Sequence, residues 1–433
     1  MRSVRITSRF ALNKFKVFKL IARIFNKMTT SLDPLKYSIE NPLIVISGCT
    51  GTGKSDLGVA IAKQFNGEII NADSMQIYKG YNVQNFREDA LEILNKLWAE
   101  QKLPVIVGGT AYYIESVIFD NNLIVTGDRG KGETIREEIL KEFPTVDTLY
   151  QELQRVDPET ASELHRNNKH RVLRALEIYR TTGKTRSEHQ KEQQKEAPEG
   201  YDHFYTRLRF KNTFLINLDM EKDVLNERLN KRVDKMMERG LLKEVTDFYD
   251  EYFGKVDKFG IMQIIGPKEF LPYLRLNIIG RNSIRGEHKI EECKEKLKTR
   301  NRQYAQRQRL WFYNRILNRG EHREIPKTLA LNSSKDFAEK LVPFALKQVK
   351  QFLSGEEIDD EKKCNGLLYK LPPLGDIFKQ EDYMENRKKI FLCDICGTEI
   401  QGKMHWKKHL EGRKHKNNLE KIKKKKGRND NQG

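Results

Sequence analysis

The fold is decided by one stretch of sequence, Gly48-Cys49-Thr50-Gly51-Thr52-Gly53-Lys54-Ser55, which fits the phosphate-loop pattern G-x-x-x-x-G-K-[ST]. In such loops the glycines let backbone N–H groups close around an anionic oxygen, the lysine adds a positive charge, and the final hydroxyl can ligate Mg²⁺. Residues 43–47 before it are typical of a buried strand, and residues 54–65 after it predict a helix whose N-terminus faces the loop. The stretch therefore predicts a pyrophosphate-binding site in an α/β fold, without specifying the pyrophosphate compound.

Two further strands are predicted downstream of this loop. Residues 68–71 read as a strand followed by the carboxylate of Asp73, and residues 103–107 read as a strand that opens into the turn Gly108-Gly109-Thr110. Ligands of open α/β sheets bind outside the carboxyl ends of the strands. We therefore expect Asp73 and Thr110 to face the phosphate loop across one crevice of a parallel-sheet core.

Several segments, taken in order, resemble the tRNA dimethylallyltransferases (tRNA isopentenyltransferases). Together they span residues 41 to about 312, and the ordered set is far more specific than the phosphate loop alone. The segments are Gly48 to Ser55, Asn71 to Gly80, Val107 to Thr110, His170 to Glu177, Arg232 to Leu241, Gln263 to Glu269 and Arg302 to Gln308.

This resemblance implies an activity. Members of the family transfer a dimethylallyl group from dimethylallyl diphosphate to the exocyclic amine of the adenosine 3′ to the tRNA anticodon. Such a reaction needs a cradle for the departing pyrophosphate, which Gly48 to Ser55 would supply together with Mg²⁺. Arg232, which matches a family arginine at the diphosphate, would add a second cation. The adenosine must leave the anticodon-loop stack to reach the crevice.

The resemblance also assigns roles to individual residues. Asp73 would accept the proton of the adenine amine, and Thr50 would orient the reacting groups, so the predicted catalytic residues are Asp73, Thr50 and Arg232. A larger set, placed by the family around the adenosine or against the anticodon arm, is predicted to contact tRNA: Asp73, Ser74, Met75, Gln76, Thr110, His170, Arg171 and Arg174.

Each of these assignments has a plainer alternative. Asp73 could be a turn former at the end of a strand. Arg232 lies on an amphipathic helix and, without the resemblance, would be read as a solvated arginine. Arg171 and Arg174 could merely flank a core stripe of their helix.

A second motif lies near the C-terminus. Cys393-x₂-Cys396-x₁₂-His409-x₅-His415 has the ligand types and spacing of a Cys₂His₂ zinc site. Phe391, Trp406 and Leu410 are expected to form a small core beneath the metal, with His405 as an exposed spare. The five-residue histidine spacing resembles matrin or U1-type fingers, which bind structured RNA and fit eukaryotic members of the transferase family.

Charge is concentrated at the two ends of the chain. The formal net charge is +19, of which residues 1–28 contribute eight basic and no acidic residues, and residues 387–428 fifteen basic against four acidic. The catalytic body between them is near neutral, so tRNA contacts are expected through local patches such as residues 294–309 and a basic tail.

The N-terminal segment is basic, amphipathic and free of acids, which is typical of a mitochondrial presequence. A second start at Met28 would omit it and leave a cytoplasmic or nuclear form. The alternative is a basic arm for RNA. The sequence contains no run of eighteen apolar residues, so it predicts no transmembrane helix. We expect a monomer.

The domain organisation follows from these features. The predicted units are a targeting segment at 1–28, a phosphate-loop core at 41–330 with a helical tRNA-binding insertion at about 120–200, a linker at 331–386, a zinc finger at 387–420 and a basic tail at 421–433.

One departure from the family is large. Gly80 runs directly into Tyr81, whereas the family carries a longer segment here with a threonine-and-lysine turn and a Pro-His-His element beside the substrate base. A catalytically impaired tRNA-binding homologue or splice form is therefore one alternative function. A phosphate-loop kinase acting on a nucleotide or small molecule is another.

Overall fold

The computed structural model of the chain describes residues 37–74, 83–120, 124, 131–195, 206–252, 265–313, 316, 324–334, 336–358, 368 and 389–429. The N-terminal segment 1–28, the predicted tRNA contacts Met75 and Gln76, and the Gly80–Tyr81 junction lie outside these ranges. Within them, no helix combines the length and the apolar character that crossing a membrane requires.

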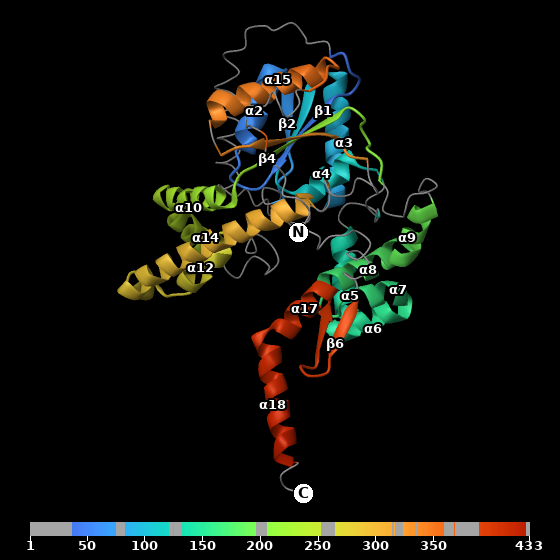
Figure 1. The fold of residues 1–433 in the computed structure, drawn as a ribbon, viewed down its shortest axis with the longest axis vertical. Coiled ribbons are helices and arrows are strands. Elements are labelled where there is room, and N and C mark those ends of the chain that lie inside the picture. The colour runs from blue at the N-terminus through green and yellow to red at the C-terminus, as the bar shows by residue number, and fades with distance from the viewer. Residues whose placement is uncertain are drawn as a thin grey trace, which may run out of the picture.

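A five-stranded parallel sheet organises the core (Figure 1). Its strands follow the order β2-β3-β1-β4-β5, so the strand that leads into the phosphate loop is central. In register, Ile44 of β1 lies opposite Val105 of β3 and Phe214 of β4. The strands are β1 (Leu43–Gly48), β2 (Gly67–Asn71), β3 (Leu103–Val107), β4 (Thr213–Asp219) and β5 (Lys327–Asn332).

Both faces of the sheet are covered by helices, which explains the nearly continuous apolar runs of the inner strands. On one face α2 (Lys54–Gln64) and α15 (Val342–Leu353) pack against side chains such as Ile46. On the other, α3 (Val83–Ala99) and α4 (Ala111–Ile118) pack against Val45. The predicted α/β parallel-sheet core is confirmed.

The predicted linker at 331–386 is wrong over its first part. Residues 327–332 form β5, which pairs with β4, and after a turn of π-helix, η4 (Phe337–Leu341), α15 covers the sheet. Phe352 of α15 stacks on Phe214 of β4 with ring centroids 5.0 Å apart. The polar residues of β5 face outward as expected of an edge strand, and this hid the strand in the sequence.

Two helical groups branch from the sheet (Figure 1). The first is held together by a core that contains Val233, Phe270 and Leu297. Its helices are α10 (Lys222–Glu238), α11 (Leu241–Tyr252), α12 (Pro267–Leu274), α13 (Ile278–Arg281) and α14 (Ile284–Phe312), and the last returns to the sheet.

The second group is the helical insertion between β3 and β4. It has its own core, with Leu149, Leu153 and Leu176 among its buried residues. Its helices are α5 (Lys131–Glu142), α6 (Val146–Val156), α7 (Pro158–Glu163), α8 (Lys169–Thr182) and α9 (Arg186–Lys195).

The C-terminal region is a hairpin followed by two helices. Phe391 stacks on Trp406 with ring centroids 5.4 Å apart, but Leu410 is 38% exposed and does not join them as expected. The elements are β6 (Ile390–Cys393), β7 (Thr398–Gln401), α17 (Lys403–Glu411) and α18 (Arg413–Asn429). Because α18 runs through residues 421–429, most of the predicted tail continues the finger's last helix.

Candidate active site and zinc site

The phosphate loop joins the end of β1 to the start of α2, and its glycines make this turn feasible. Gly51 and Gly53 both have a φ of 89°, in the left-handed region that L side chains rarely adopt. A Cβ on Gly48 would lie 2.3 Å from the carbonyl oxygen of Leu218 in β4. Inside the loop, the buried Thr52 hydroxyl donates to the Cys49 carbonyl at 2.9 Å. The loop is therefore shaped by backbone conformation and close packing.

Lys54 lies at the first position of α2, and its ammonium donates to the carbonyl of Cys49 at 2.7 Å. Burial, assisted by the nearby charge of Arg232 and opposed by Cys49 and Asp73, lowers the pKa of Lys54 to about 8. Burial also raises the pKa of the Cys49 thiol to about 11, and the charge of Asp219 adds to that shift. The positive charge of Lys54 would thus be strongly stabilised by an anion that binds in the loop.

Arg232 reaches this loop from α10. Its guanidinium Nη1 donates to the hydroxyl of Thr50 at 3.1 Å. The helix is fixed on α14 by the carboxylate of Asp234, which lies 3.0 Å from Lys298 Nζ, and by Asn230, which accepts from Arg302 at 2.6 Å. Arg232 is exposed, as an arginine on a solvated helix face would be, but this hydrogen bond directs it to the loop.

The other predicted site residues of the sheet edge follow β2 and β3. The Thr110 hydroxyl accepts from the backbone N–H of Ser74 at 2.9 Å and donates to the Ser74 hydroxyl at 3.0 Å. Asp73 precedes this pair, and its charge acts on both Lys54 and Tyr304. Asp73 and Thr110 thus lie at the carboxyl edge of the sheet together with the phosphate loop, as the sequence predicted.

Gln308 of α14 lies between the phosphate loop and the turn 108–110. It was not among the predicted site residues. Its Oε1 accepts from the backbone N–H of Thr50 at 2.9 Å, and its Nε2 donates to the carbonyl of Gly109 at 3.0 Å. The neighbouring Arg309 is bonded to Asp219 at the end of β4, with Nε 3.0 Å from Oδ1. The only sequence signal was the segment Arg302 to Gln308, which carries the family resemblance but does not indicate this bridge.

The predicted tRNA-binding residues of the insertion lie on α8, in a different part of the molecule from the phosphate loop (Figure 1). His170 and Arg171 are exposed. Arg174 donates to the buried carboxylate of Glu177 at 2.8 Å, and Arg136 of α5 donates to the same carboxylate at 2.8 Å. Arg174 is therefore partly committed to the insertion itself, whereas Arg171 presents its side chain to solvent.

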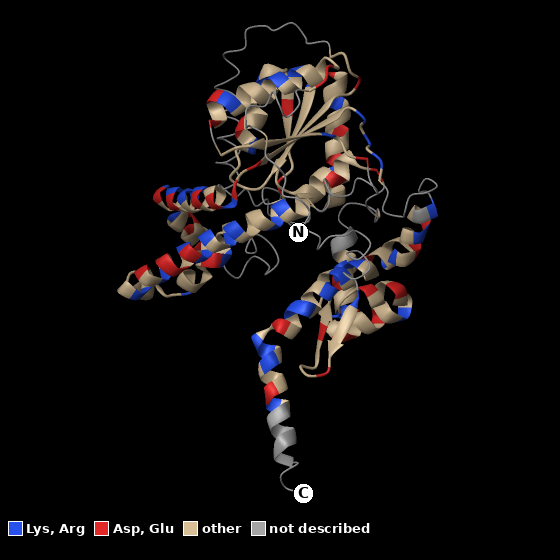
Figure 2. Cartoon of the chain, in the orientation of Figure 1, with Lys and Arg blue, Asp and Glu red and all other residues tan. Residues whose placement is uncertain are grey.

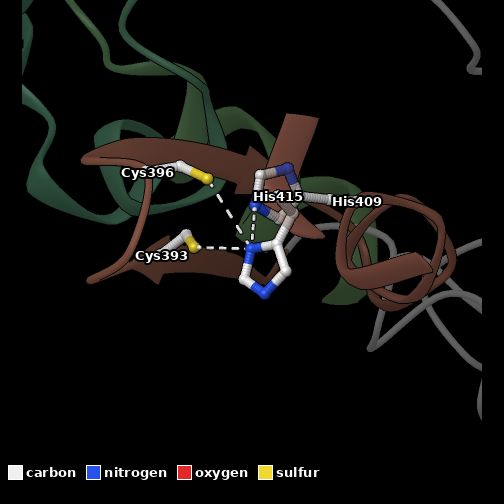
Figure 3. Close-up of side chains that lie close together, drawn as sticks. All are labelled: Cys393, Cys396, His409 and His415. Carbon is white, nitrogen blue, oxygen red and sulfur yellow. Dashed lines mark hydrogen bonds between the residues drawn. The ribbon is translucent and has the colours of Figure 1, made fainter. Parts of the chain in front are cut away.

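The four predicted zinc ligands converge (Figure 3). Nδ1 of His415 lies 3.4 Å from Cys393 Sγ, 3.6 Å from Cys396 Sγ and 3.2 Å from His409 Nε2. Tetrahedral zinc with bonds of about 2.3 Å to sulfur and 2.0–2.1 Å to nitrogen places its ligands roughly 3.3–3.8 Å apart. Thiolate and imidazole donors at this spacing fit Zn²⁺. His405 is exposed and stands apart, as expected.

The finger is docked on the insertion through its hairpin. His165 Nε2 lies 3.1 Å from the carbonyl of Glu399 in β7, and Gln401 donates to the carbonyl of Glu163. The guanidinium of Arg166 lies 3.7 Å from the Glu399 carboxylate and 5.5 Å from the ring centroid of Tyr150. Basic residues occur along α17 and the described part of α18 (Figure 2). The hairpin that carries Cys393 and Cys396 is thus in direct contact with the insertion.

Comparisons with known proteins agree with this geometry. The sequence model of the IPP transferase family matches residues 70–315. The tRNA dimethylallyltransferase of Homo sapiens is 32% identical over 422 residues, covering 88% of this chain and 86% of that relative. The enzyme of the same name from Saccharomyces cerevisiae is 31% identical over 433 residues, covering 89% and 94%.

The structural comparison extends over most of the chain. A solved structure, described as crystallographic snapshots of eukaryotic dimethylallyltransferase acting on tRNA, aligns with a TM-score of 0.67 and 27% identity. The alignment covers 90% of this chain and 100% of that one. With the family model matching more than half of its residues, and with relatives this similar over nearly their full length, this chain belongs to the IPP transferase family.

Proposed function

We propose that this protein is a tRNA dimethylallyltransferase. It would transfer a dimethylallyl group from dimethylallyl diphosphate to the exocyclic amine of the adenosine 3′ to the anticodon. The observation that carries the proposal is the convergence of a phosphate loop and a carboxylate at one edge of the sheet, since Gln308 joins the loop to Gly109 and Thr110 is bonded to Ser74, which follows Asp73. A diphosphate site and a proton acceptor then share a single crevice.

The reaction makes one bond and breaks another, and the residues of the site would stabilise the charges that develop. The amine nitrogen forms a bond to C1 of the dimethylallyl group while the C1–O bond breaks, and the diphosphate leaves with the electron pair. Lys54, Arg232 and the N–H groups of the loop would stabilise that departing charge. The carboxylate of Asp73 would accept the proton that the amine loses, which typically accelerates a reaction by roughly 10²–10⁴-fold.

Mg²⁺ is part of this proposal. The exposed Ser55 hydroxyl at the start of α2 is an oxygen donor, and Mg²⁺ prefers to combine one or two protein oxygens with phosphate oxygens and water. When bound there, Mg²⁺ would neutralise part of the charge on the diphosphate.

The tRNA would be held by parts of the molecule away from the crevice. Arg171 is exposed on α8, and the finger that docks beside this helix carries basic residues along α17 and α18 (Figure 2). Contacts between such side chains and phosphates supply affinity that falls as salt rises. The anticodon arm would lie against the insertion and the finger while its adenosine leaves the base stack.

The proposed function is tested by incubating the protein, in the longer form with the family segment after Gly80 restored, with labelled dimethylallyl diphosphate, Mg²⁺ and tRNA. We expect label on the adenosine beside the anticodon and none on a tRNA in which that position is guanosine. Lys54→Met should abolish transfer, whereas Lys63→Met, at an exposed position of the same helix, should not. ATP turnover without tRNA would favour the kinase instead, and tRNA binding without transfer would favour the impaired homologue.

We also propose that residues 1–28 direct one form of the protein to mitochondria, and that starting at Met28 yields a cytoplasmic or nuclear form. The proposal rests on the eight basic residues and absent acids of this segment. Fusing the full chain and a chain starting at Met28 to a fluorescent protein should give mitochondrial and non-mitochondrial signals respectively. The same distribution for both would contradict the proposal.

A further inference from the structure

Three residues fix the position of Gln308: Arg309, Thr50 and Gly109. Its backbone is anchored because Arg309 bonds to Asp219 and to the carbonyl of Met220. Its side-chain amide is used at both ends, accepting from Thr50 and donating to Gly109. The amide group has an acceptor oxygen and a donor nitrogen. The oxygen is paired with the phosphate loop, and the nitrogen is paired with the turn at Gly109.

The contact with Gly109 depends on the absence of a side chain there. A Cβ at this position would lie 2.3 Å from Nε2 of Gln308. The residue after Gly109 is Thr110, whose hydroxyl holds Ser74 next to Asp73. A continuous series of hydrogen bonds and peptide units therefore leads from the phosphate loop through Gln308 to the proposed proton acceptor.

At the phosphate loop, the series of hydrogen bonds begins at Thr50. The N–H of Thr50 points to Gln308, while its hydroxyl accepts from Arg232. A diphosphate that binds Arg232 and the loop therefore acts on the residue that Gln308 holds. Tyr304, one turn earlier on α14, lies beside both Gln308 and Thr110.

We propose that Gln308 is a positioning residue that couples the diphosphate site to the adenosine site. Diphosphate in the loop fixes Thr50, Gln308 transmits this constraint to the turn 108–110, and the turn aligns Asp73 with the incoming base. The proposal rests on the proposed function, since it assumes that the two substrates occupy the diphosphate site and the adenosine site. Binding of each ligand then changes the affinity for the other by the same factor.

The test measures binding, so it does not require turnover. The affinity for inorganic pyrophosphate is determined with Mg²⁺ by titration calorimetry, with and without an anticodon stem-loop RNA. We expect a coupling factor of at least about fivefold in the wild-type protein, within the usual range for coupled sites. In Gln308→Leu, which loses both hydrogen bonds, the factor should fall to about one while each single affinity stays within roughly threefold.

Three further variants sharpen the result. Gln308→Glu keeps an acceptor for Thr50 but opposes the carbonyl of Gly109, so it should also lose coupling. Gly109→Ala displaces the amide and should have the same effect, with little added by combining it with Gln308→Leu. Gln64→Glu, the same change at an exposed position of α2, is the control and should keep the wild-type factor.

The outcomes separate this inference from the proposed function. Both ligands binding wild-type protein with a coupling factor of one would overturn the role of Gln308, and so would undiminished coupling in Gln308→Leu. A wild-type protein that binds pyrophosphate and RNA with coupling but transfers no dimethylallyl group would leave the inference standing. In the longer form with the segment after Gly80 restored, that same result would refute the proposed activity.

Discussion

Lys54 makes the diphosphate site sensitive to pH. Its pKa is lowered to about 8, chiefly by burial, so the ammonium is charged below pH 8 and loses its charge above it. Because the charged form attracts the diphosphate, we expect the affinity for pyrophosphate to fall as pH rises from 7 to 9, by up to about tenfold for each pH unit above the pKa.

The measurement is a series of pyrophosphate dissociation constants across this range. Pyrophosphate itself titrates, so Lys54→Met provides the reference, because it carries the same ligand titration without the lysine. The difference between the two profiles isolates Lys54. Parallel profiles would show that the lysine does not titrate near pH 8.

Asp73→Asn is the corresponding change at the adenosine site. The amide keeps the size of the side chain but cannot accept the proton, so in the longer, active form turnover should fall at least roughly 10²-fold with little change in tRNA affinity. Single-turnover transfer and tRNA binding are measured on the same preparation. Near-normal single-turnover transfer by this variant would remove Asp73 from the role of proton acceptor.

Local chemistry made some of these residues predictable and others not. The phosphate loop and the zinc ligands were found because contiguous or regularly spaced residues carry their function. Gln308 was not, because its role arises from two backbone partners, Thr50 and Gly109, that are far from it in sequence. Leu410 was placed in the finger core on its apolar character alone, yet the packing leaves it exposed.

At the scale of elements, α15 is expected to be an integral part of the sheet domain. Phe352 is 7% exposed and stacks on Phe214, so Phe352→Ala should lower the free energy of unfolding by about 3–5 kcal/mol. Urea unfolding of the sheet domain measures this loss. Leu410→Ala, at an exposed site, should change stability by less than about 0.5 kcal/mol. Equal changes in the free energy of unfolding for the two variants would show that α15 acts as a linker and does not stabilise the sheet.

The zinc finger should behave as a separate folding unit. Small zinc domains derive most of their folding energy from the metal, so Cys393→Ser should unfold β6, β7 and α17 while the sheet remains folded. Hydrogen exchange should then increase in the finger and also at residues 163–166, where the hairpin docks. Cys364→Ser is the control for the substitution. Metal analysis of the wild-type protein showing no bound zinc would contradict the prediction.

The elements differ in how clearly the sequence reveals them. Strands β1 and β3 are almost wholly buried and were predicted from their apolar runs, whereas β4 is equally buried but was not among the predicted strands. In β5, Leu329 and Leu331 alternate with more exposed residues, and the strand is stabilised by pairing with β4 rather than by its own pattern. Such an edge strand becomes recognisable only once its neighbour is known.

For the whole molecule, we expect the Gly80–Tyr81 junction to determine how active the chain is. Because β2 and α3 flank the junction and both pack in the core, the protein should fold and bind pyrophosphate. Without the family segment beside the base, the adenosine would be held poorly, and a displacement of about 1 Å can cost roughly 10²-fold. We therefore expect weak or absent transfer by the 433-residue chain.

A longer form supplies the comparison. Transcript sequencing should reveal a version with the segment restored, and that version should transfer dimethylallyl groups efficiently under identical conditions. Robust transfer by the shorter chain would show that the segment is dispensable.

The strand order has a consequence for how the protein is made. The phosphate loop emerges from the ribosome early, but β4, β5 and α15, which complete the sheet around β1, follow as late as residue 353. At about 5–20 residues per second, translation of the intervening chain takes roughly 15 to 60 s. During this interval the apolar faces of β1 and β3 lack part of their cover. We therefore expect the nascent chain to present apolar surface to chaperones, and ligand binding at the loop to begin only once residues up to 353 have been made.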